Sequence, residues 1–256
     1  MDKAIDLVFE TCERFSNERI FLTDQLIHNP YINSKLKEKG VSYLKRDSQN
    51  LLICDELKPT DKVVVSAFGT DFRDIQNLKA RGVTIVDSTC GAIINVWKRV
   101  EGYAKNGFIT IMHGKRNHEE TRATVSQALK EGGYYITIEN KTEALELASV
   151  ILGKISENDF LAKYPSAAPG GFIFDAATCK MGMANQTTML KGDSLEIQDI
   201  LKRAFVERFG QEPAHERFKS FDTICGATQD RQDALRKLLN IKMDLILIVG
   251  GFNSSN

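Results

Sequence analysis

The sequence predicts an α/β fold, in which short strands alternate with amphipathic helices along most of the chain. Two observations support this prediction. Short β-branched runs such as 62–67 and 83–87 end in turns, and each turn leads into a stretch with apolar residues at helical spacing. Repeated strand–helix units of this kind form right-handed βαβ connections and mostly parallel sheets. We therefore expect ligands to bind beyond the carboxyl ends of the strands.

The first part of the chain contains the best-marked elements. Asn29 followed by Pro30 is typical of an N-cap with proline at the first helical position, and Gly40 is expected to end that helix. The pattern predicts a helix over 2–14, a strand over 19–23, a helix up to 40, strands over 41–44 and 62–67, a helix over 71–79, and a strand over 83–87 with a helix to about 105.

The second part continues the alternation. It predicts a strand over 108–112 with a helix to about 130, a strand over 134–138 with a helix over 142–152, a short segment with a polar end over 182–189, helices over 194–209 and 229–239, and an apolar strand over 243–249. Between them, 154–171 is rich in Ser, Asn, Asp, Pro and Gly, which indicates a variable connection or insertion.

Composition excludes several classes of protein. Lys plus Arg and Asp plus Glu number 34 each, which argues against binding nucleic acid or a membrane surface by bulk positive charge, although a local anion site remains possible. The five cysteines are widely spaced and form no Cys-x-x-Cys motif, so neither a disulfide framework nor a zinc ribbon is predicted. The apolar runs have the length of strands, and we expect no membrane span and no export signal.

Polar side chains at the predicted turns are the candidates for chemistry. Cys90 follows a strand in the turn 87–90, although an isolated cysteine is more often a small buried hydrophobe. His118 and Glu120 begin a helix, where the first could bind an anion and the second move a proton, although acidic residues such as Glu119 and Glu120 often only complement the helix dipole in a first turn. The other polar candidates also have plain alternatives: His28 as an ordinary histidine, Gln186, Thr187 and Thr188 as a turn, and Lys115 and Arg116 as solvated side chains.

We assign Cys12 and Cys179 to packing, and Cys54 lies in a polar connector without a partner motif. The chain starts in a helix with no strand before it and stops at a Ser-Ser-Asn turn that normally leads into a phosphate-binding helix N-terminus. Both ends are therefore expected to be truncated.

Six motifs together resemble one protein family. They are Ile27-His-Asn-Pro30, Asp87-Ser-Thr-Cys90, the His-Gly-Lys-Arg-Asn-His-Glu-Glu-Thr run over 113–121, and the segments 184–192, 224–234 and 249–256. Their order and approximate spacing are similar to those of the 4-hydroxy-3-methylbut-2-enyl diphosphate reductases, the last enzymes of the non-mevalonate isoprenoid pathway. The resemblance covers essentially the whole chain, and Ala67-Phe68-Gly69 matches the plant and cyanobacterial branch.

The resemblance implies a fold and an activity. The fold would be three α/β domains around a central cavity: 1–90, 91–221 with the variable connection near 154–171, and an incomplete third domain over 222–256. The activity would be reductive dehydroxylation of an allylic diphosphate to isopentenyl and dimethylallyl diphosphate. A ferredoxin or flavodoxin would supply electrons, with no nucleic-acid or membrane partner, in the cytoplasm or, in a photosynthetic eukaryote, the plastid stroma.

Site residues carry over from the family by motif position. Cys90 and Cys225 would be two of the three cysteine ligands of a 4Fe-4S cluster with one open iron, a role that suits soft thiolate sulfur. Glu120 would donate the proton, and Thr187 would relay it. The substrate diphosphate would be bound by His28, His118, Ser254, Ser255 and Asn256.

The sequence departs from the family pattern at three places. The first cluster cysteine would precede Met1, a Gly-Ala-Ser segment would follow Asn256, and Gly91 replaces the usual proline after Cys90. Two thiolates hold a cubane cluster poorly. Two hypotheses therefore remain: a fragment of a working iron–sulfur reductase, or a truncated paralogue without a cluster that is inactive or only binds a diphosphate or a partner protein.

Overall fold

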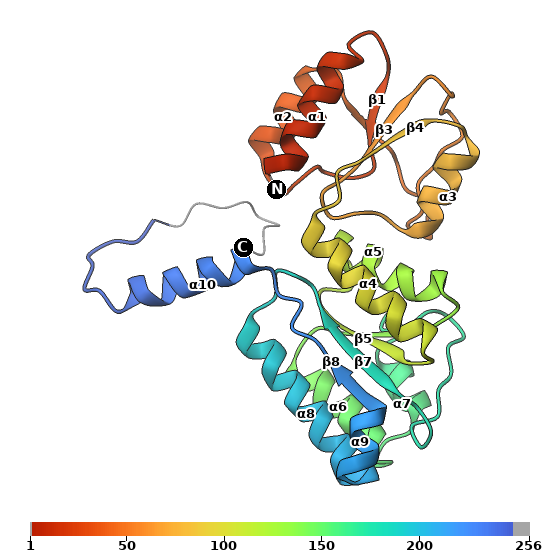
Figure 1. Ribbon diagram of the computed structural model, residues 1–256, viewed down its shortest axis with the longest axis vertical. Helices are drawn as coiled ribbons and strands as arrows, with labels where there is room; N and C mark the ends of the chain where they lie inside the picture. The colour runs from red at the N-terminus through yellow and green to blue at the C-terminus, as the bar shows by residue number, and fades with distance from the viewer. Residues whose placement is uncertain (1, 248–256) are drawn as a thin grey trace. The chain divides into compact units, whose positions relative to one another are not determined.

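The structure is a computed structural model, and it describes residues 2–247. The described residues divide into two compact units, one formed by 2–94 together with 243–247, and the other by Asn95–Lys242. Each unit is built on a parallel four-stranded sheet (Figure 1), which confirms the predicted α/β class with repeated βαβ units. The division into three domains at 90 and 221 stays a prediction.

The first unit has the sheet order β2-β1-β3-β4. Its strands are β1 (Ile20–Leu22), β2 (Ser42–Tyr43), β3 (Lys62–Val65) and β4 (Thr84–Asp87), and its helices are α1 (Asp2–Arg14), α2 (Pro30–Glu38) and α3 (Phe72–Ala80). All three strand pairs are parallel. The expected cap of α2 is confirmed, because the Asn29 side chain accepts hydrogen bonds from the amides of Tyr31 and Ile32, and Gly40 follows the helix at φ 83°.

Two small cores fill the faces of this first sheet. Val8 of α1 and Leu36 of α2 pack with Leu22 and Val64 on one face. On the other face, Leu78 of α3 packs with Val63 and with Leu52, Cys54 and Leu57 from the connector between β2 and β3. The connector therefore contributes to the core, and Cys54, which was predicted to lie in a polar loop, is buried.

The second unit has the sheet order β6-β5-β7-β8, again entirely parallel. Its strands are β5 (Ile109–His113), β6 (Tyr135–Ile138), β7 (Met181–Asn185) and β8 (Phe218–Ser220). Its helices are α4 (Gly91–Lys105, which begins in the first unit), α5 (Glu119–Lys130), α6 (Lys141–Ile151), α7 (Glu157–Lys163), α8 (Lys191–Phe209), α9 (Gln211–Arg217) and α10 (Gly226–Leu239).

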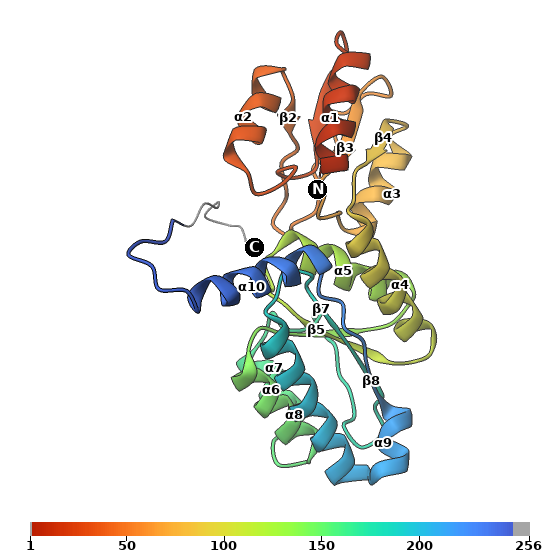
Figure 2. The ribbon, with the colours of Figure 1, turned by 60° about the vertical axis from the view of Figure 1, so that its left-hand side comes forward.

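Helices cover both faces of the second sheet, as Figures 1 and 2 show. Leu147 of α6 and Leu201 of α8 pack on one face with Ile111 and Ile136, whereas Val100 of α4 and Val125 of α5 belong to the core of the other face. The predicted segment over 182–189 overlaps β7, which begins one residue earlier and lies between β5 and β8. Tyr103 lies so close to Gly182 of β7 that an added Cβ would meet its ring at 2.4 Å.

The structure corrects three predictions about elements. The apolar run 243–247 is not a strand, because no neighbouring strand pairs with it among residues 2–247, and its last two positions lie outside the described residues. The connection 154–171 contains α7, whose Phe160 is buried in the core. The elements α9 and β8 were not predicted, since both are very short. Within residues 2–247, no helix has the length and apolarity that a membrane crossing requires.

Candidate functional site

A buried carboxyl group lies at the start of α5 in the second unit. Glu120 is 1% exposed, although it belongs to the first turn of a helix. Its two oxygens accept hydrogen bonds from Thr187, at 2.6 Å from the backbone amide and 3.0 Å from the hydroxyl. Thr187 follows β7 as Glu120 follows β5, so the two residues meet beyond the carboxyl ends of neighbouring strands.

The protonation of Glu120 is set mainly by its burial. Removal from water disfavours the carboxylate and raises the pKa of Glu120 to about 7, while the two hydrogen bonds from Thr187 act in the opposite direction. No ion pair within residues 2–247 includes this carboxyl group. At neutral pH the side chain is therefore divided between a form that can donate a proton and a form that can accept one.

The loop that carries Thr187 is fixed by Gln186, whose side chain is completely buried. Its Oε1 accepts hydrogen bonds from the Lys115 amide at 3.0 Å and from the Thr121 hydroxyl at 3.3 Å, and its Nε2 donates to Thr188 at 2.8 Å. A Cβ atom at Gly114 would lie 2.8 Å from the Gln186 side chain, so glycine is needed there. These contacts connect the loops after β5 and β7.

His118 is the N-cap of α5, and its ring has a defined orientation. Its Nδ1 accepts a hydrogen bond from the Glu120 amide at 3.1 Å. In the neutral imidazole the proton is therefore on Nε2, which can donate to another group. The prediction that His118 and Glu120 open one helix is confirmed, and the same backbone turn connects them.

Arg116, which was predicted to be solvated, is instead packed into the loop. Its side chain is 13% exposed and forms an ion pair with Glu143 at the start of α6. It also donates to the Thr137 carbonyl of β6 at 3.2 Å, and its own amide donates to Glu139 at 2.6 Å. Arg116 thus holds the loop before His118 against β6 and α6. Local sequence contains no signal for this role, because both acidic partners come from a later part of the chain.

Cys225 lies next to the same loop. It is the N-cap of α10, and its amide donates to the Thr187 carbonyl at 2.9 Å. Thr187 therefore contacts Glu120 through its side chain and amide, and Cys225 through its carbonyl oxygen. The structure brings Glu120, Thr187 and Cys225 together in the second unit. His118 lies two residues before Glu120, at the N-cap of the same helix.

Cys90 lies in a well-ordered turn of the first unit. The Asp87 side chain accepts from the Thr89 amide at 2.9 Å, and the Ser88 hydroxyl donates to the Val65 carbonyl at 2.5 Å. The Cys90 amide donates to the Ala67 carbonyl at 2.9 Å, and the Cys90 carbonyl accepts from Ile94 in the first turn of α4. The expected strand–turn–helix arrangement around Cys90 is confirmed.

His28 belongs to the same part of the first unit. Its ring stacks on Phe68, with centroids 4.4 Å apart and an interplanar angle of 27°. Phe68 lies in a turn that Gly69 closes at φ 80°. Since Ala67 bonds to Cys90 and Phe68 stacks on His28, the turn 67–69 joins these two candidates.

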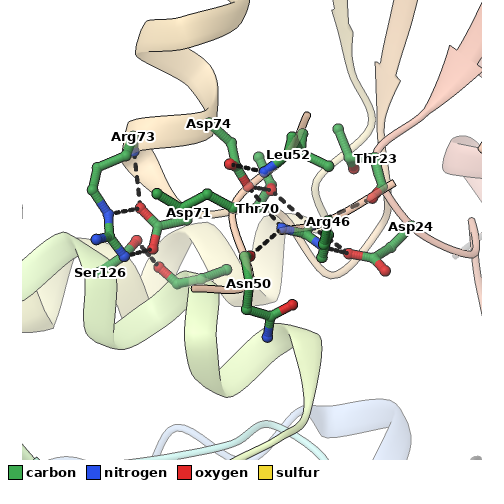
Figure 3. A network of polar contacts seen from close by, with 12 residues as sticks. Thr23, Asp24, Arg46, Asn50, Leu52, Thr70, Asp71, Arg73, Asp74 and Ser126 are labelled. Atoms are coloured by element: carbon green, nitrogen blue, oxygen red, sulfur yellow. Dashed lines mark hydrogen bonds and ion pairs between the residues drawn. The ribbon is translucent and has the colours of Figure 1, made fainter. Parts of the chain in front are cut away.

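A network of charged groups lies beside this turn (Figure 3). Arg46, from the connector after β2, pairs with Asp24 at 2.6 Å and with Asp74 at 3.0 Å. Asp74 is completely buried and also accepts from the Thr70 hydroxyl at 2.7 Å and the Leu52 amide at 2.8 Å. The network ties the connector to the ends of β1 and β3. Its residues were not identified from the sequence, because Asp24, Arg46 and Asp74 are spread over 50 positions that include one helix and two strands.

The five cysteines differ in their exposure. Cys12, Cys54 and Cys179 are buried, and burial raises the pKa of each thiol, for Cys179 to about 11. Cys90 and Cys225 are instead partly exposed and free of disulfides. Ser254, Ser255 and Asn256 lie outside the described residues.

Comparisons with known proteins agree with the sequence motifs. The model of one family, described as LytB protein, matches residues 1–256. A protein of Thermosynechococcus vestitus named 4-hydroxy-3-methylbut-2-enyl diphosphate reductase is 40% identical over the whole chain, which covers 62% of that protein. A protein of Synechococcus sp. (strain WH7803) with the same name is 38% identical, and 63% of it is covered. The chain therefore spans less than two thirds of the length of these relatives.

Solved structures share the fold. The E-1-hydroxy-2-methyl-but-2-enyl-4-diphosphate reductase of Plasmodium falciparum superposes with a TM-score of 0.67 at 21% identity, covering 93% of this chain and 60% of that one. A second structure, of an (E)-4-hydroxy-3-methyl-but-2-enyl diphosphate reductase, gives a TM-score of 0.64 at 21% identity and covers 93% of this chain and 68% of the other.

Proposed function

Because the chain belongs to the LytB protein family, we propose that it performs the chemistry for which its relatives are named, the reductive dehydroxylation of 4-hydroxy-3-methylbut-2-enyl diphosphate. The products would be isopentenyl and dimethylallyl diphosphate. The observation that supports this best is the buried pair of Glu120 and Thr187 next to Cys225. Loss of a hydroxyl group as water requires a proton, and a carboxyl group whose pKa is raised to about 7 can deliver one at neutral pH.

The residues of this chain divide the work by their chemistry. Protonated Glu120 would give its proton to the Thr187 hydroxyl oxygen, as this hydroxyl turns away from Glu120 and gives its own proton to the leaving hydroxyl group. His118 would donate from Nε2 to a phosphate oxygen, since its Nδ1 is engaged by the Glu120 amide. His28, Ser254, Ser255 and Asn256 would add further donors to the diphosphate.

Cys90 and Cys225 fit the requirements for ligands of a 4Fe-4S cluster. Both are free and partly exposed, and each directly precedes a long helix, α4 or α10, whose N-terminal amides favour nearby negative charge. The three buried cysteines do not fit, so a third ligand would come from outside this set. When bound, the cluster would supply electrons and an open iron position for the substrate oxygen. A ferredoxin or flavodoxin would supply the electrons, and a cytoplasmic or plastid location would suit these partners.

Anaerobic loading with iron and sulfide, followed by an assay with the diphosphate substrate and a chemical reductant, tests the proposal. Because the third ligand would come from outside these five cysteines, an external thiol is added during loading; we then expect about four irons per chain and turnover. Glu120→Gln should keep the iron and lose turnover by at least about 100-fold, because general acid catalysis typically contributes this much. Glu119→Gln, one position earlier on the same helix, is the matched control and should stay active. Failure of the unaltered chain to bind iron would favour the alternative, a paralogue without a cluster. Full activity of Glu120→Gln would remove the proton-donor assignment.

A further inference from the structure

The segment that leads to Cys225 continues alongside β7 after the paired residues of strand β8 have ended. Phe218, Lys219 and Ser220 of β8 pair in register with Met181, Gly182 and Met183 of β7. The Phe221 amide still reaches the Met183 carbonyl at 3.4 Å, and four residues later the Cys225 amide donates to Thr187 at 2.9 Å. The two segments thus stay aligned past the point where backbone pairing in the ladder ends.

Thr223 spans the interval between these two contacts. Its hydroxyl oxygen accepts from the Asn185 amide at 2.7 Å and donates to the Asn185 carbonyl at 2.9 Å. One side chain thereby satisfies both backbone groups of a residue that is only 4% exposed. In a regular parallel ladder, the backbone of the neighbouring strand would make these bonds.

Asn185 is itself held from the other side. It pairs in register with His113 of β5, and the His113 Nδ1 lies 3.3 Å from the Asn185 side-chain oxygen and 3.0 Å from the hydroxyl of Ser194 in α8. The next residue, Gln186, donates its amide to the His113 carbonyl at 2.8 Å. Thr223 therefore bonds to a fixed residue of the sheet, Asn185. Thr223 lies two residues before Cys225, and Asn185 lies two residues before Thr187.

We infer that Thr223 is a positioning residue, whose hydroxyl replaces one rung of the β7–β8 ladder and thereby fixes Cys225 next to Thr187 and Glu120. The inference uses the role proposed above for Cys225 as a cluster ligand. Ligands must be held rigidly if the metal group they bind is to face the proton donor, and contacts behind the ligand supply that rigidity. Thr223 supplies such a contact through the backbone, without touching the thiol.

The test compares Thr223→Val, which keeps the shape and removes the hydroxyl, with Thr223→Ser, which keeps the hydroxyl. Amide hydrogen exchange is measured in the unloaded 256-residue chain. We expect Thr223→Val to speed exchange at Asn185 and Cys225 by about tenfold or more, with little change at Met181–Met183. Alkylation of Cys225 by iodoacetamide should accelerate relative to Cys90 in the same molecule. Thr223→Ser should restore both values.

In the unloaded chain, two outcomes would overturn the inference: exchange and alkylation in Thr223→Val equal to those of the unaltered chain, or the same acceleration at every amide in both variants. Anaerobic iron loading separates this inference from the proposed function. If the unaltered chain binds no iron although the local effects appear, Thr223 keeps its positioning role and the cluster proposal fails. If the chain binds iron and Thr223→Val holds it with an unchanged electron paramagnetic resonance spectrum, the positioning role fails alone.

Discussion

Both units bury a carboxyl group near the carboxyl ends of their strands, but they surround it differently. In the first unit, Asp74 pairs with the Arg46 guanidinium at 3.0 Å and accepts two further hydrogen bonds. In the second unit, the hydrogen bonds that Glu120 receives from residues 2–247 come only from the neutral donors of Thr187. Asp74 is thus bound to a cation and to two further donors, whereas at Glu120 the effect of burial exceeds that of the neutral donors and raises the pKa of the carboxyl group. The comparison separates a group that ties loops together from a group suited to exchanging a proton.

The largest effect is expected from breaking the pair in the first unit. Arg46→Ala leaves the Asp74 carboxylate, which is 0% exposed, without its cation. Removing one partner of a buried ion pair typically lowers the free energy of unfolding by about 3 kcal/mol or more. Urea unfolding followed by circular dichroism measures the change.

Arg73→Ala is the matched control for that experiment, because Arg73 pairs with Asp71 in the same region while its side chain is 44% exposed. We expect this exposed pair to contribute less than about 1 kcal/mol. Equal losses in the two variants would contradict the structural distinction between the buried network and its exposed neighbour.

In the second unit, the charged form of the buried carboxyl group, Glu120, should lower the free energy of unfolding. Burial raises the pKa of Glu120 from 4.5 to about 7, so the folded chain binds more protons than the unfolded chain between these values. Stability should therefore fall as pH rises through this window, by up to about 3 kcal/mol, and level off above it. Glu120→Gln removes the titrating group, so the variant should gain stability relative to the parent from pH 4.5 to 7.

Urea unfolding at several pH values measures this difference, with Glu119→Gln as the control. Glu119 begins the same helix but its side chain is 24% exposed. Its substitution should change the free energy of unfolding much less than that of Glu120. Parallel profiles for the parent chain and Glu120→Gln would show that Glu120 titrates normally.

The smallest effect concerns the helix after Cys90. Gly91 is the first residue of α4, and an added Cβ would meet nothing within 4 Å. Gly91→Ala should raise the free energy of unfolding by about 0.5 kcal/mol, because alanine has less freedom to lose on folding. Gly210→Ala, at φ 83°, is the contrasting control and should destabilise the chain. A loss of stability in Gly91→Ala would mean that the turn before α4 needs glycine for its backbone conformation, although there is space for a Cβ atom.

Features that depend on neighbouring residues were predictable from the sequence. The cap formed by Asn29 and Pro30 and the turn that ends in Cys90 were both identified correctly, since their determinants lie within a few positions. The central strand β7 was harder, because Met181–Asn185 lacks the β-branched residues that marked β3. The run 243–247 shows the reverse error: strand-like residues form no strand without a partner to pair with.

In the candidate site, the burial of the key side chains could not be predicted from neighbouring residues. A glutamate in the first turn of a helix is usually solvated, and Glu120 differs because a threonine 67 positions later covers it. Arg116 becomes buried through Glu143, and Asp74 through Arg46, again over long separations. Motif resemblance supplied Glu120, Thr187 and Cys225 as candidates, but only the fold shows that they share one hydrogen-bonded loop.

The most direct measurement is the titration of Glu120 by carbon-13 nuclear magnetic resonance of its carboxyl group, with Glu120→Gln used to assign the signal. The structure predicts a midpoint at about 7, raised by burial against two hydrogen bonds from Thr187. Such a carboxyl group exchanges a proton at neutral pH, as the proposed reaction requires. A midpoint at or below the ordinary value of 4.5 would show that Glu120 is a permanent carboxylate, and would contradict its role as the proton donor.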